Sequence, residues 1–149
     1  MATVTILYYS KEGHTKALAE VIKGILDPLL PSGIQSEIVS ATTLNFDRFK
    51  DKEKVAFMFG SPDYFSDVAG YLKIFFDDLW EQRSVFKGRP AMGFITHGGG
   101  GKATKALEHL CDAFKFNYIT PAISTGKPAD DKLKVQIKSN CEKLVKLLK

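Results

Sequence analysis

Five short hydrophobic runs of strand length alternate with longer stretches along the chain. The run at residues 54–60 is apolar at nearly every position, which is typical of a central strand in a parallel sheet that is buried on both faces. The last run contains Pro121, which has no amide proton for a neighbouring strand and therefore indicates an edge position. The five runs lie at residues 4–9, 34–40, 54–60, 91–96 and 118–124.

The stretches between and after these runs carry apolar residues at the spacing of an α-helix. The apolar positions of the four expected helices fall within residues 18–26, 68–79, 103–114 and 133–148. The polar segment 45–54 predicts only a short or irregular helix. Asp130 or Asp131 is expected to cap the last helix, because an aspartate oxygen at that position accepts a hydrogen bond from the first helical turn.

This alternation of strands and helices predicts the fold class. Parallel neighbouring strands are joined by crossover connections, which are usually helices. We therefore expect an α/β fold with a doubly wound five-stranded parallel sheet between two helical layers, that is, three layers in all. The 149 residues have the length of one domain and contain no repeat or linker, so one domain is expected over residues 1–149.

The composition is that of an ordinary globular protein, with 44% hydrophobic and 26% charged residues. No apolar run approaches the ~20 residues of a membrane helix, and the net charge of +4 is spread along the chain instead of forming a basic stripe. We expect neither a membrane nor nucleic acid as a partner. The N-terminus shows no export signal, which predicts a cytoplasmic location. Cys111 and Cys141 fall on apolar helical faces and are expected to be buried thiols.

Three loops are chemically distinctive, and each follows one of the predicted strands. They lie at residues 10–15, 61–66 and 97–101, after the first, third and fourth strands. Ligands of doubly wound sheets bind beyond the carboxyl ends of the strands, at the point where the strand order reverses. These three loops are therefore the candidate ligand site.

The first loop joins a strand directly to a helix and is suited to hold a phosphate. Free backbone N–H groups and the positive end of the helix dipole attract an oxygen-rich anion. Ser10 and Thr15 offer hydroxyl donors, Lys11 and His14 offer positive charge, and Gly13 permits a positive φ. A hydroxyl of Ser10 or Thr15 could equally cap the helix, and both interpretations stay open on this stretch.

Several familiar motifs are absent. The run 98–102 ends in Gly-Lys, as the phosphate loop of nucleotide triphosphatases does. That loop also needs Gly at position 96 and Ser or Thr at position 103, whereas this chain has Thr96 and Ala103. A dinucleotide fingerprint fails because the first loop has only Gly13, and a phospho-receiver domain would carry acidic residues there. The three histidines are scattered and form neither a catalytic triad nor a metal site. A ligand with a phosphate at one end and a flat, hydrogen-bonding ring at the other, such as FMN, fits the three loops.

The three loops resemble those of flavodoxin-like FMN-binding proteins. Ser-Lys-Glu-Gly-His-Thr at residues 10–15 resembles the Ser/Thr-x-x-Gly-x-Thr phosphate loop of flavodoxins. Gly-Ser-Pro-Asp-Tyr-Phe at 60–65 is similar to Gly-Thr/Ala-Pro-Thr-Arg-Phe in the Trp-repressor-binding-protein-like NAD(P)H:quinone oxidoreductases. Thr-His-Gly-Gly-Gly-Gly at 96–101 resembles their Gly-rich third loop. The similarity covers nearly the whole chain.

The resemblance implies FMN as the cofactor, with its phosphate in the first loop and its ring between the other two. Tyr64 or Phe65 would stack on the ring, and His97 would lie on its pyrimidine side. The residues that it assigns to cofactor binding are Ser10, Lys11, Gly13, His14 and Thr15, then Ser61, Pro62, Asp63, Tyr64 and Phe65, and finally Thr96, His97, Gly98, Gly99 and Gly100.

Two functions are consistent with such a site. The first is an electron carrier between redox proteins. Its basic net charge favours acidic partners, and it is expected to be a monomer or a dimer. The alternative is an NAD(P)H-dependent reductase of quinones or free flavin. The resembling quinone reductases have a longer segment before the final helix than residues 124–131 provide, which favours the carrier. Neither function needs a catalytic side chain, because the flavin supplies the chemistry. A non-redox interaction module would leave the three loops unexplained.

Overall fold

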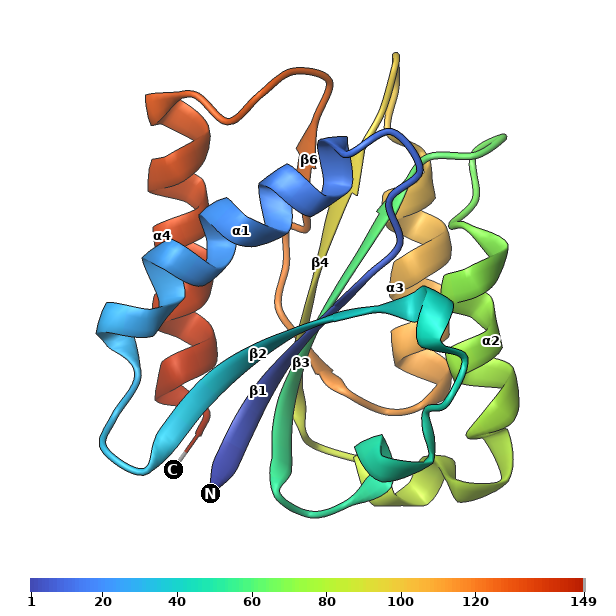
Figure 1. Ribbon diagram of the computed structural model, residues 1–149, viewed down its shortest axis with the longest axis vertical. Helices are drawn as coiled ribbons and strands as arrows, with labels where there is room; N and C mark the ends of the chain where they lie inside the picture. Colours follow the sequence, from blue (N-terminus) through green and yellow to red (C-terminus); the bar gives the residue numbers. More distant parts are fainter. Residues whose placement is uncertain (149) are drawn as a thin grey trace.

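The computed structural model describes residues 1–148. Its centre is a parallel sheet in the order β2-β1-β3-β4-β5, with β6 also paired to β4 (Figure 1). Every pairing between neighbouring strands is parallel, which confirms the predicted α/β doubly wound class. The strands are β1 (Ala2–Tyr8), β2 (Ile34–Ser40), β3 (Lys54–Pro62), β4 (Pro90–Thr96), β5 (Asn117–Tyr118) and β6 (Ile123–Thr125).

The fifth strand predicted at residues 118–124 is divided into β5 and β6. β5 pairs with Pro90 and Ala91 at the start of β4, and β6 pairs with residues 94–96 at its end. Pro121 lies between the two pieces and cannot donate a backbone hydrogen bond, so the ladder is interrupted there. The edge position expected from this proline is observed, but the single continuous strand is not.

Helices cover both faces of the sheet. Figure 1 shows α1 and α4 on one face and α2 and α3 on the other, which gives the three layers that were predicted. The segment 45–54 forms only a short 3-10 turn, in agreement with the irregular helix expected there. The α-helices are α1 (His14–Leu26), α2 (Gly70–Asp78), α3 (Ala103–Ala113) and α4 (Asp131–Lys146), and the 3-10 helices are Asp27–Leu29, Ala41–Thr43, Asp47–Lys50 and Trp80–Phe86.

Each face of the sheet has its own hydrophobic core. Aliphatic side chains from α1 and α4, such as Ile22 and Ile137, pack against β1 and β4 on one side. The other core is built largely of phenylalanines, and the rings of Phe59 and Phe75 have their centres 5.2 Å apart. Aromatic rings bury large areas and prefer such offset or edge contacts, so this core fixes α2 firmly to the sheet.

The strand register brings the three distinctive loops to one end of the sheet. Tyr8 of β1 is paired with Gly60 of β3, and Pro62 of β3 is paired with Thr96 of β4. The loops that follow these strands therefore emerge side by side. They lie beside β1, where the strand order reverses: β2 is placed on one side of β1, and β3 and the later strands are placed on the other. This is the switch point at which ligands of such sheets bind.

The start of α4 is capped as predicted. Asp130 is the N-cap residue, and its carboxylate accepts a hydrogen bond of 2.8 Å from the backbone N–H of Leu133. Among residues 1–148, none of the helices combines the length and the apolar character that crossing a bilayer requires.

Candidate functional site

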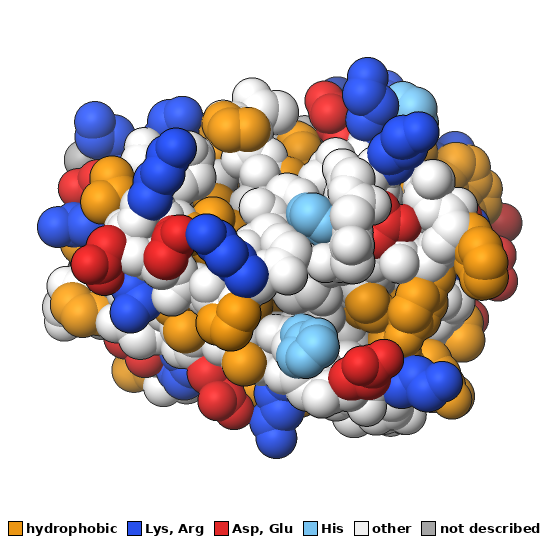
Figure 2. All heavy atoms as spheres, turned by 90° about the horizontal axis from the view of Figure 1, so that it is seen from above, with side chains coloured by type: hydrophobic (Ala, Val, Ile, Leu, Met, Phe, Trp, Pro, Cys, Tyr) orange, Lys and Arg blue, Asp and Glu red, His pale blue; other side chains and the backbone are white. Residues whose placement is uncertain are grey.

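A pocket of about 580 Å³ opens at the carboxyl end of the sheet. Figure 2 looks onto this end of the molecule, where uncharged polar and backbone atoms occupy much of the centre and charged side chains of both signs stand mainly around them. The volume falls within the range of about 300 to 1,000 Å³ that small-molecule sites occupy. Of the predicted site residues, those that line the pocket are Ser10, Lys11, His14, Thr15, Pro62, Asp63, Tyr64, Thr96, His97 and Gly98.

The first loop is folded so that the amino end of α1 stays open. The hydroxyl of Ser10 accepts a hydrogen bond of 3.0 Å from the N–H of Gly13, which closes the loop, and Gly13 has a φ of 99°. No side chain caps α1, and its first turn contains no acidic residue. The helix-cap interpretation of Ser10 and Thr15 is therefore wrong. The free N–H groups of this turn are available to an anion.

Thr15 and Thr96 join the first loop to the end of β4. Their hydroxyl oxygens lie 2.8 Å apart, and both residues are buried. One hydroxyl donates to the other, so the pair keeps one further O–H that can donate to a ligand oxygen. Two residues that are 81 positions apart in the sequence thus form one polar contact in the floor of the pocket.

Asp63 ties the second loop to its surroundings. Its backbone N–H donates to the carbonyl of Thr96 at 2.8 Å. Its carboxylate accepts from the N–H of Ser66 at 2.8 Å and from the N–H of Ala103, at the start of α3, at 3.2 Å. These bonds employ both carboxylate oxygens. Asp63 lines the pocket, and it also holds the second loop against the third.

The two candidate stacking residues lie in different places. Tyr64 lines the pocket and exchanges two backbone hydrogen bonds with Asp67, of 2.8 and 3.0 Å. Burial, with smaller contributions from Tyr9 and Glu12, raises the pKa of its phenol above the ordinary value. Phe65 is fully exposed at the tip of the turn, with a φ of 56°, and does not line the pocket. Of the two rings, the structure brings only Tyr64 to the site.

Ser61 does not reach the pocket. Its side chain is completely buried, and its hydroxyl donates to the carbonyl of Pro62 at 2.7 Å and accepts from the N–H of Ala69 at 2.8 Å. The hydroxyl therefore anchors the approach to α2. Gly13, Gly99 and Gly100 likewise are not among the lining residues, although the first shapes the phosphate loop.

His97 contributes a buried polar atom to the third loop. Its Nδ1 has no hydrogen-bond partner within residues 1–148, while its backbone N–H donates to the carbonyl of Thr125 at 3.1 Å. A Cβ at Gly101 would come within 2.8 Å of the imidazole ring, so glycine is required beside it. A buried nitrogen without a partner is costly, and a ligand in the pocket can satisfy it.

A further wall of the pocket was missed by the sequence reasoning. It is formed by α1 beyond its first turn and by the segment between β6 and α4. This segment follows β6, which is paired in parallel with β4, so its loop also emerges at the carboxyl edge. The only sequence feature that could have pointed to this wall is the turn-forming composition of Thr-Gly-Lys-Pro-Ala at 125–129, directly after an edge strand. The additional lining residues are Glu12, Ala17, Leu18, Val21, Thr125, Gly126, Lys127, Pro128, Ala129 and Lys134.

The cations at the pocket are lysines. Lys11, Lys127 and Lys134 line it, and the carboxylates among the lining residues are Glu12 and Asp63. All three arginines of the chain are engaged elsewhere, as expected from their absence in the predicted loops. Arg48 pairs with a carboxylate of β2, Arg83 lies over Trp80, and Arg89 donates to the carbonyl of Lys54. In the described part of the chain, no cluster of side chains suited to hold a metal ion is found.

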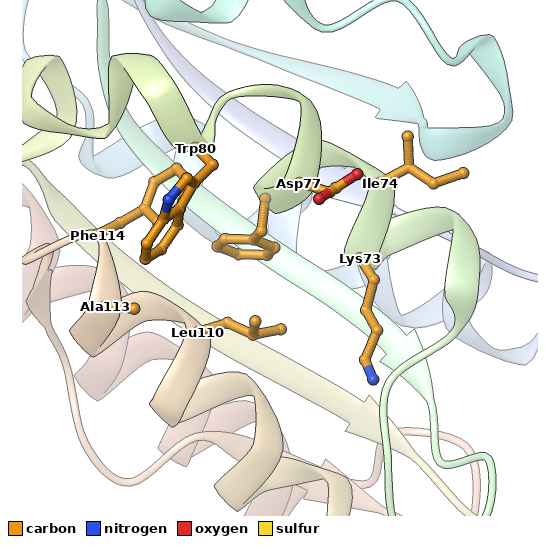
Figure 3. Close-up of a pocket in the computed structure, with 8 residues that line it drawn as sticks. Lys73, Ile74, Asp77, Trp80, Leu110, Ala113 and Phe114 are labelled. Atoms are coloured by element: carbon orange, nitrogen blue, oxygen red, sulfur yellow. The ribbon is translucent and has the colours of Figure 1, made fainter.

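A second cavity of about 520 Å³ lies between α2 and α3, away from the three loops (Figure 3). Its walls are mostly apolar and include Trp80, Leu110 and Phe114. The guanidinium of Arg83 lies 3.9 Å from the centre of the Trp80 ring and donates to the Trp80 carbonyl, which fixes the indole. The cavity offers neither free backbone donors nor a hydroxyl, so the loop pocket is the better ligand site.

The pocket residues fit FMN on features of this chain alone. The open amino end of α1 suits a terminal phosphate, Tyr64 offers an aromatic face, and the Nδ1 of His97 lacks a partner that a polar ring could provide. The polar groups come from three loops that converge, which is the arrangement expected of a preformed cofactor site.

Solved structures with the same fold cover nearly the whole chain. A flavodoxin from the domain Archaea is 20% identical over 98% of each chain, with a TM-score of 0.81. An oxidoreductase from Corynebacterium diphtheriae is 14% identical over 99% of this chain and 97% of its own, with a TM-score of 0.85. A flavodoxin, WrbA-like protein from Agrobacterium tumefaciens is 13% identical, with coverages of 99% and 96% and a TM-score of 0.67. These likenesses establish the flavodoxin-like fold.

Sequence comparison identifies the family. No curated protein matches the chain significantly. The sequence model of the family described as NADPH-dependent FMN reductase matches residues 48–130, which is more than half of the chain and includes the second and third loops and the segment before α4. The chain therefore belongs to the NADPH-dependent FMN reductase family, and FMN is the flavin that it binds.

Proposed function

We propose that the protein holds FMN in the loop pocket and carries electrons between redox proteins. The observation that carries this proposal is the open second loop. It lies at the surface, where Phe65 is fully exposed, and only residues 126–130 separate β6 from α4. The described chain thus contains no long segment there to cover a ring that stacks on Tyr64. An exposed flavin edge suits electron exchange with a docked partner.

The residues of the pocket would bind and orient the cofactor. The first turn of α1 and Lys11 would hold the phosphate, and the hydroxyl pair of Thr15 and Thr96 would donate to an oxygen of the ligand. Tyr64 would stack on the ring, and His97 would present its unpaired Nδ1 to a polar ring edge. When bound, the flavin supplies the capacity to accept and release electrons, and no side chain has to act as acid, base or nucleophile.

The charge of the protein favours acidic partners. The net charge is +4, and Lys11, Lys127 and Lys134 line the pocket together with two carboxylates, those of Glu12 and Asp63. Complementary charge mainly raises the rate at which partners meet, and this effect weakens as salt screens the charges. Electron transfer to an acidic redox protein should accordingly slow as ionic strength rises.

A reductase that oxidises NAD(P)H is the second candidate. The family description names NADPH, and the wall formed by residues 125–129 and Lys134 enlarges the pocket beyond the three loops. Hydride transfer needs the dinucleotide to be held beside the flavin, because positioning contributes much of the rate. The additional wall is the feature of this chain that could provide such a surface.

Anaerobic reduction of the FMN-loaded protein separates the two functions. A carrier should be reduced slowly by NADH and by NADPH and rapidly by the reduced form of a one-electron dye, with the flavin absorbance as the readout. Rapid reduction by either nucleotide, followed by sustained turnover on a quinone or on free FMN, would establish the reductase. Absence of detectable FMN binding by the purified protein would refute both.

A further inference from the structure

We propose that Tyr9 and Tyr71 are positioning residues, which hold the ring of Tyr64 in the orientation in which it stacks on the flavin. We call these three rings the tyrosine ladder. The proposal rests on the proposed function, because Tyr64 lines the pocket in which the flavin is placed, whereas Tyr9 and Tyr71 do not line it. Tyr9 and Tyr71 therefore act on the cofactor only through Tyr64.

The backbone of Tyr64 is fixed without the ladder, but its ring is not. The N–H of Tyr64 donates to the carbonyl of Asp67 at 2.8 Å, and the N–H of Asp67 donates to the carbonyl of Tyr64 at 3.0 Å. The carboxylate of Asp67 also forms an ion pair with Lys73 of α2. These contacts fix the Cα of Tyr64 and leave the side chain free to turn about χ1, which has three staggered rotamers. A neighbouring group is needed to select one of them.

Tyr9 is this neighbouring group. The ring centres of Tyr9 and Tyr64 lie 6.4 Å apart, and the ring planes meet at 66°, which is an edge contact. Edge contacts between aromatic rings are favourable, so this one restricts the rotation of Tyr64. An edge contact occupies at most one face of the Tyr64 ring. The other face is left for the flavin.

Tyr9 is itself held on two sides. It directly follows β1, and its backbone N–H donates to the carbonyl of Gly60 in β3 at 3.0 Å. Its ring stacks on that of Tyr71, with centres 4.8 Å apart and an angle of 17° between the planes. Tyr71 lies in the first turn of α2, which begins at the end of the sheet where the second loop emerges (Figure 1). The ladder thus ties the ring of Tyr64 to β1 and α2.

Stability alone does not account for the aromatic ring of Tyr71. Tyr9 packs partly against the phenylalanine core, but Tyr71 is 40% exposed. The free energy gained by burial is proportional to the apolar area removed from water, so much of it is missing at this position. What the stack provides is a flat support that keeps the ring of Tyr9 in place.

The expected effect follows from rotamer populations. If the ring of Tyr64 were free among three rotamers of similar energy, about one third of the molecules would present it to the flavin. The apparent Kd of a ligand is its intrinsic Kd divided by the competent fraction. Tyr9→Ala should therefore raise the Kd of the flavin by up to about threefold. Tyr9→Phe keeps both ring contacts and should leave the Kd unchanged.

The test is a double-mutant cycle, with FMN and riboflavin titrated in parallel by fluorescence. Tyr9→Ala should raise both Kd values by the same factor in the otherwise unmodified protein. In the Tyr64→Ala background it should change neither, because the ring that it positions is gone. A loss confined to FMN would mean that the substitution disturbs the neighbouring phosphate loop, and would overturn the proposal.

The emission of the bound flavin gives a second readout, because a stacked tyrosine quenches flavin fluorescence. At saturating riboflavin, Tyr9→Ala and Tyr71→Ala should both raise the emission, and Tyr9→Phe should restore it to the level of the unmodified protein. Trp80→Ala is the matched control, since Trp80 is 43% exposed, is similar in exposure to Tyr71 and lies outside the ladder. It should change neither emission nor Kd.

The outcomes separate the ladder from the proposed function. If Tyr64→Ala weakens flavin binding but Tyr9→Ala changes neither Kd nor emission, the ladder is overturned and the placement of the flavin stands. An equal effect of Tyr9→Ala in both backgrounds also overturns the ladder, because Tyr9 would then act independently of Tyr64. Absence of detectable FMN binding by the unmodified protein would refute the proposed function, and the ladder with it.

Discussion

Replacing Gly13 by alanine tests the phosphate loop most directly. Gly13 has a φ of 99°, a left-handed conformation that side chains with a Cβ rarely adopt, and a Cβ placed there would have no neighbouring atom within 4 Å. The cost to the free protein is therefore backbone strain without a clash. We expect Gly13→Ala to lower the free energy of unfolding by about 1 to 2 kcal/mol.

The chain offers a matched control for this strain. Gly33 has a φ of 89° and also has open space around its Cβ position, but it lies in the turn before β2 and does not line the pocket. Gly33→Ala should lower the free energy of unfolding by a similar amount. Any difference between the two variants in ligand binding then reports on the loop itself, since both carry the same kind of strain.

The effect on FMN follows from the backbone donors at the start of α1. Alanine at position 13 favours a negative φ and would turn the adjoining N–H groups away from the phosphate. The loss of one hydrogen bond to a charged group costs about 2 kcal/mol, which corresponds to a roughly thirtyfold rise in Kd. Riboflavin has no phosphate, so its Kd should change little in Gly13→Ala.

Titrations that follow flavin fluorescence give both Kd values, and urea denaturation gives the free energy of unfolding. The expected pattern is a large loss of FMN affinity in Gly13→Ala alone, with riboflavin affinity preserved. An equal loss for both flavins, or an equal loss of FMN affinity in Gly33→Ala, would refute the assignment of the phosphate to this loop.

Three further predictions concern the ring, the pocket floor and acid stability. Tyr64→Ala should weaken the binding of FMN and of riboflavin alike, by about 0.5 to 1.5 kcal/mol beyond the loss of contact area. Phe65→Ala should leave both Kd values from fluorescence titrations unchanged. A loss of affinity in Phe65→Ala alone would place the ring against Phe65. Thr15→Val leaves the buried hydroxyl of Thr96 without its partner and should lower the free energy of unfolding by about 1 to 3 kcal/mol. Urea denaturation measures this change, and unchanged stability would contradict the role of the pair. Burial raises the pKa of Glu37, but hydrogen bonds from Lys54, Thr5 and Arg48 outweigh this effect and hold the pKa below its ordinary value. The ionised carboxylate therefore stabilises the fold above its unfolded pKa, and this contribution is lost as pH falls through the folded pKa. Glu37→Gln should flatten the decline of stability at acid pH, and an unchanged decline would disprove this.

The sheet was predictable because its strands carry strong local signals. β2 runs over residues 34–40, as predicted, and the apolar run at 54–60 forms all of β3 except its last two residues. Continuous apolar runs between helical periods leave few alternatives to a parallel sheet. Once the strand order is that of a doubly wound sheet, the carboxyl-end loops have to meet, so the general location of the pocket also followed from the sequence.

The details of the pocket depend on contacts that no local pattern encodes. The hydroxyl of Ser61 looked available to a ligand, but the N–H of Ala69 occupies it after the chain turns toward α2. Phe65 looked equivalent to Tyr64, but its positive φ directs it into solvent. The wall at residues 125–129 depends on the pairing of β6 with β4 across a broken strand. Each of these outcomes is set by tertiary structure.

The burial of both cysteines has a consequence for a protein that binds a flavin. Cys111 and Cys141 are completely buried, one in each core, and burial raises the pKa of the Cys141 thiol to about 12 and that of Cys111 well above its ordinary value. Only a thiolate is a good nucleophile toward peroxide, and peroxide also has to reach it. Reoxidation of a reduced flavin by air should therefore leave these sulfur atoms unmodified. Repeated cycles of reduction and aeration should not change the mass of the polypeptide at either cysteine.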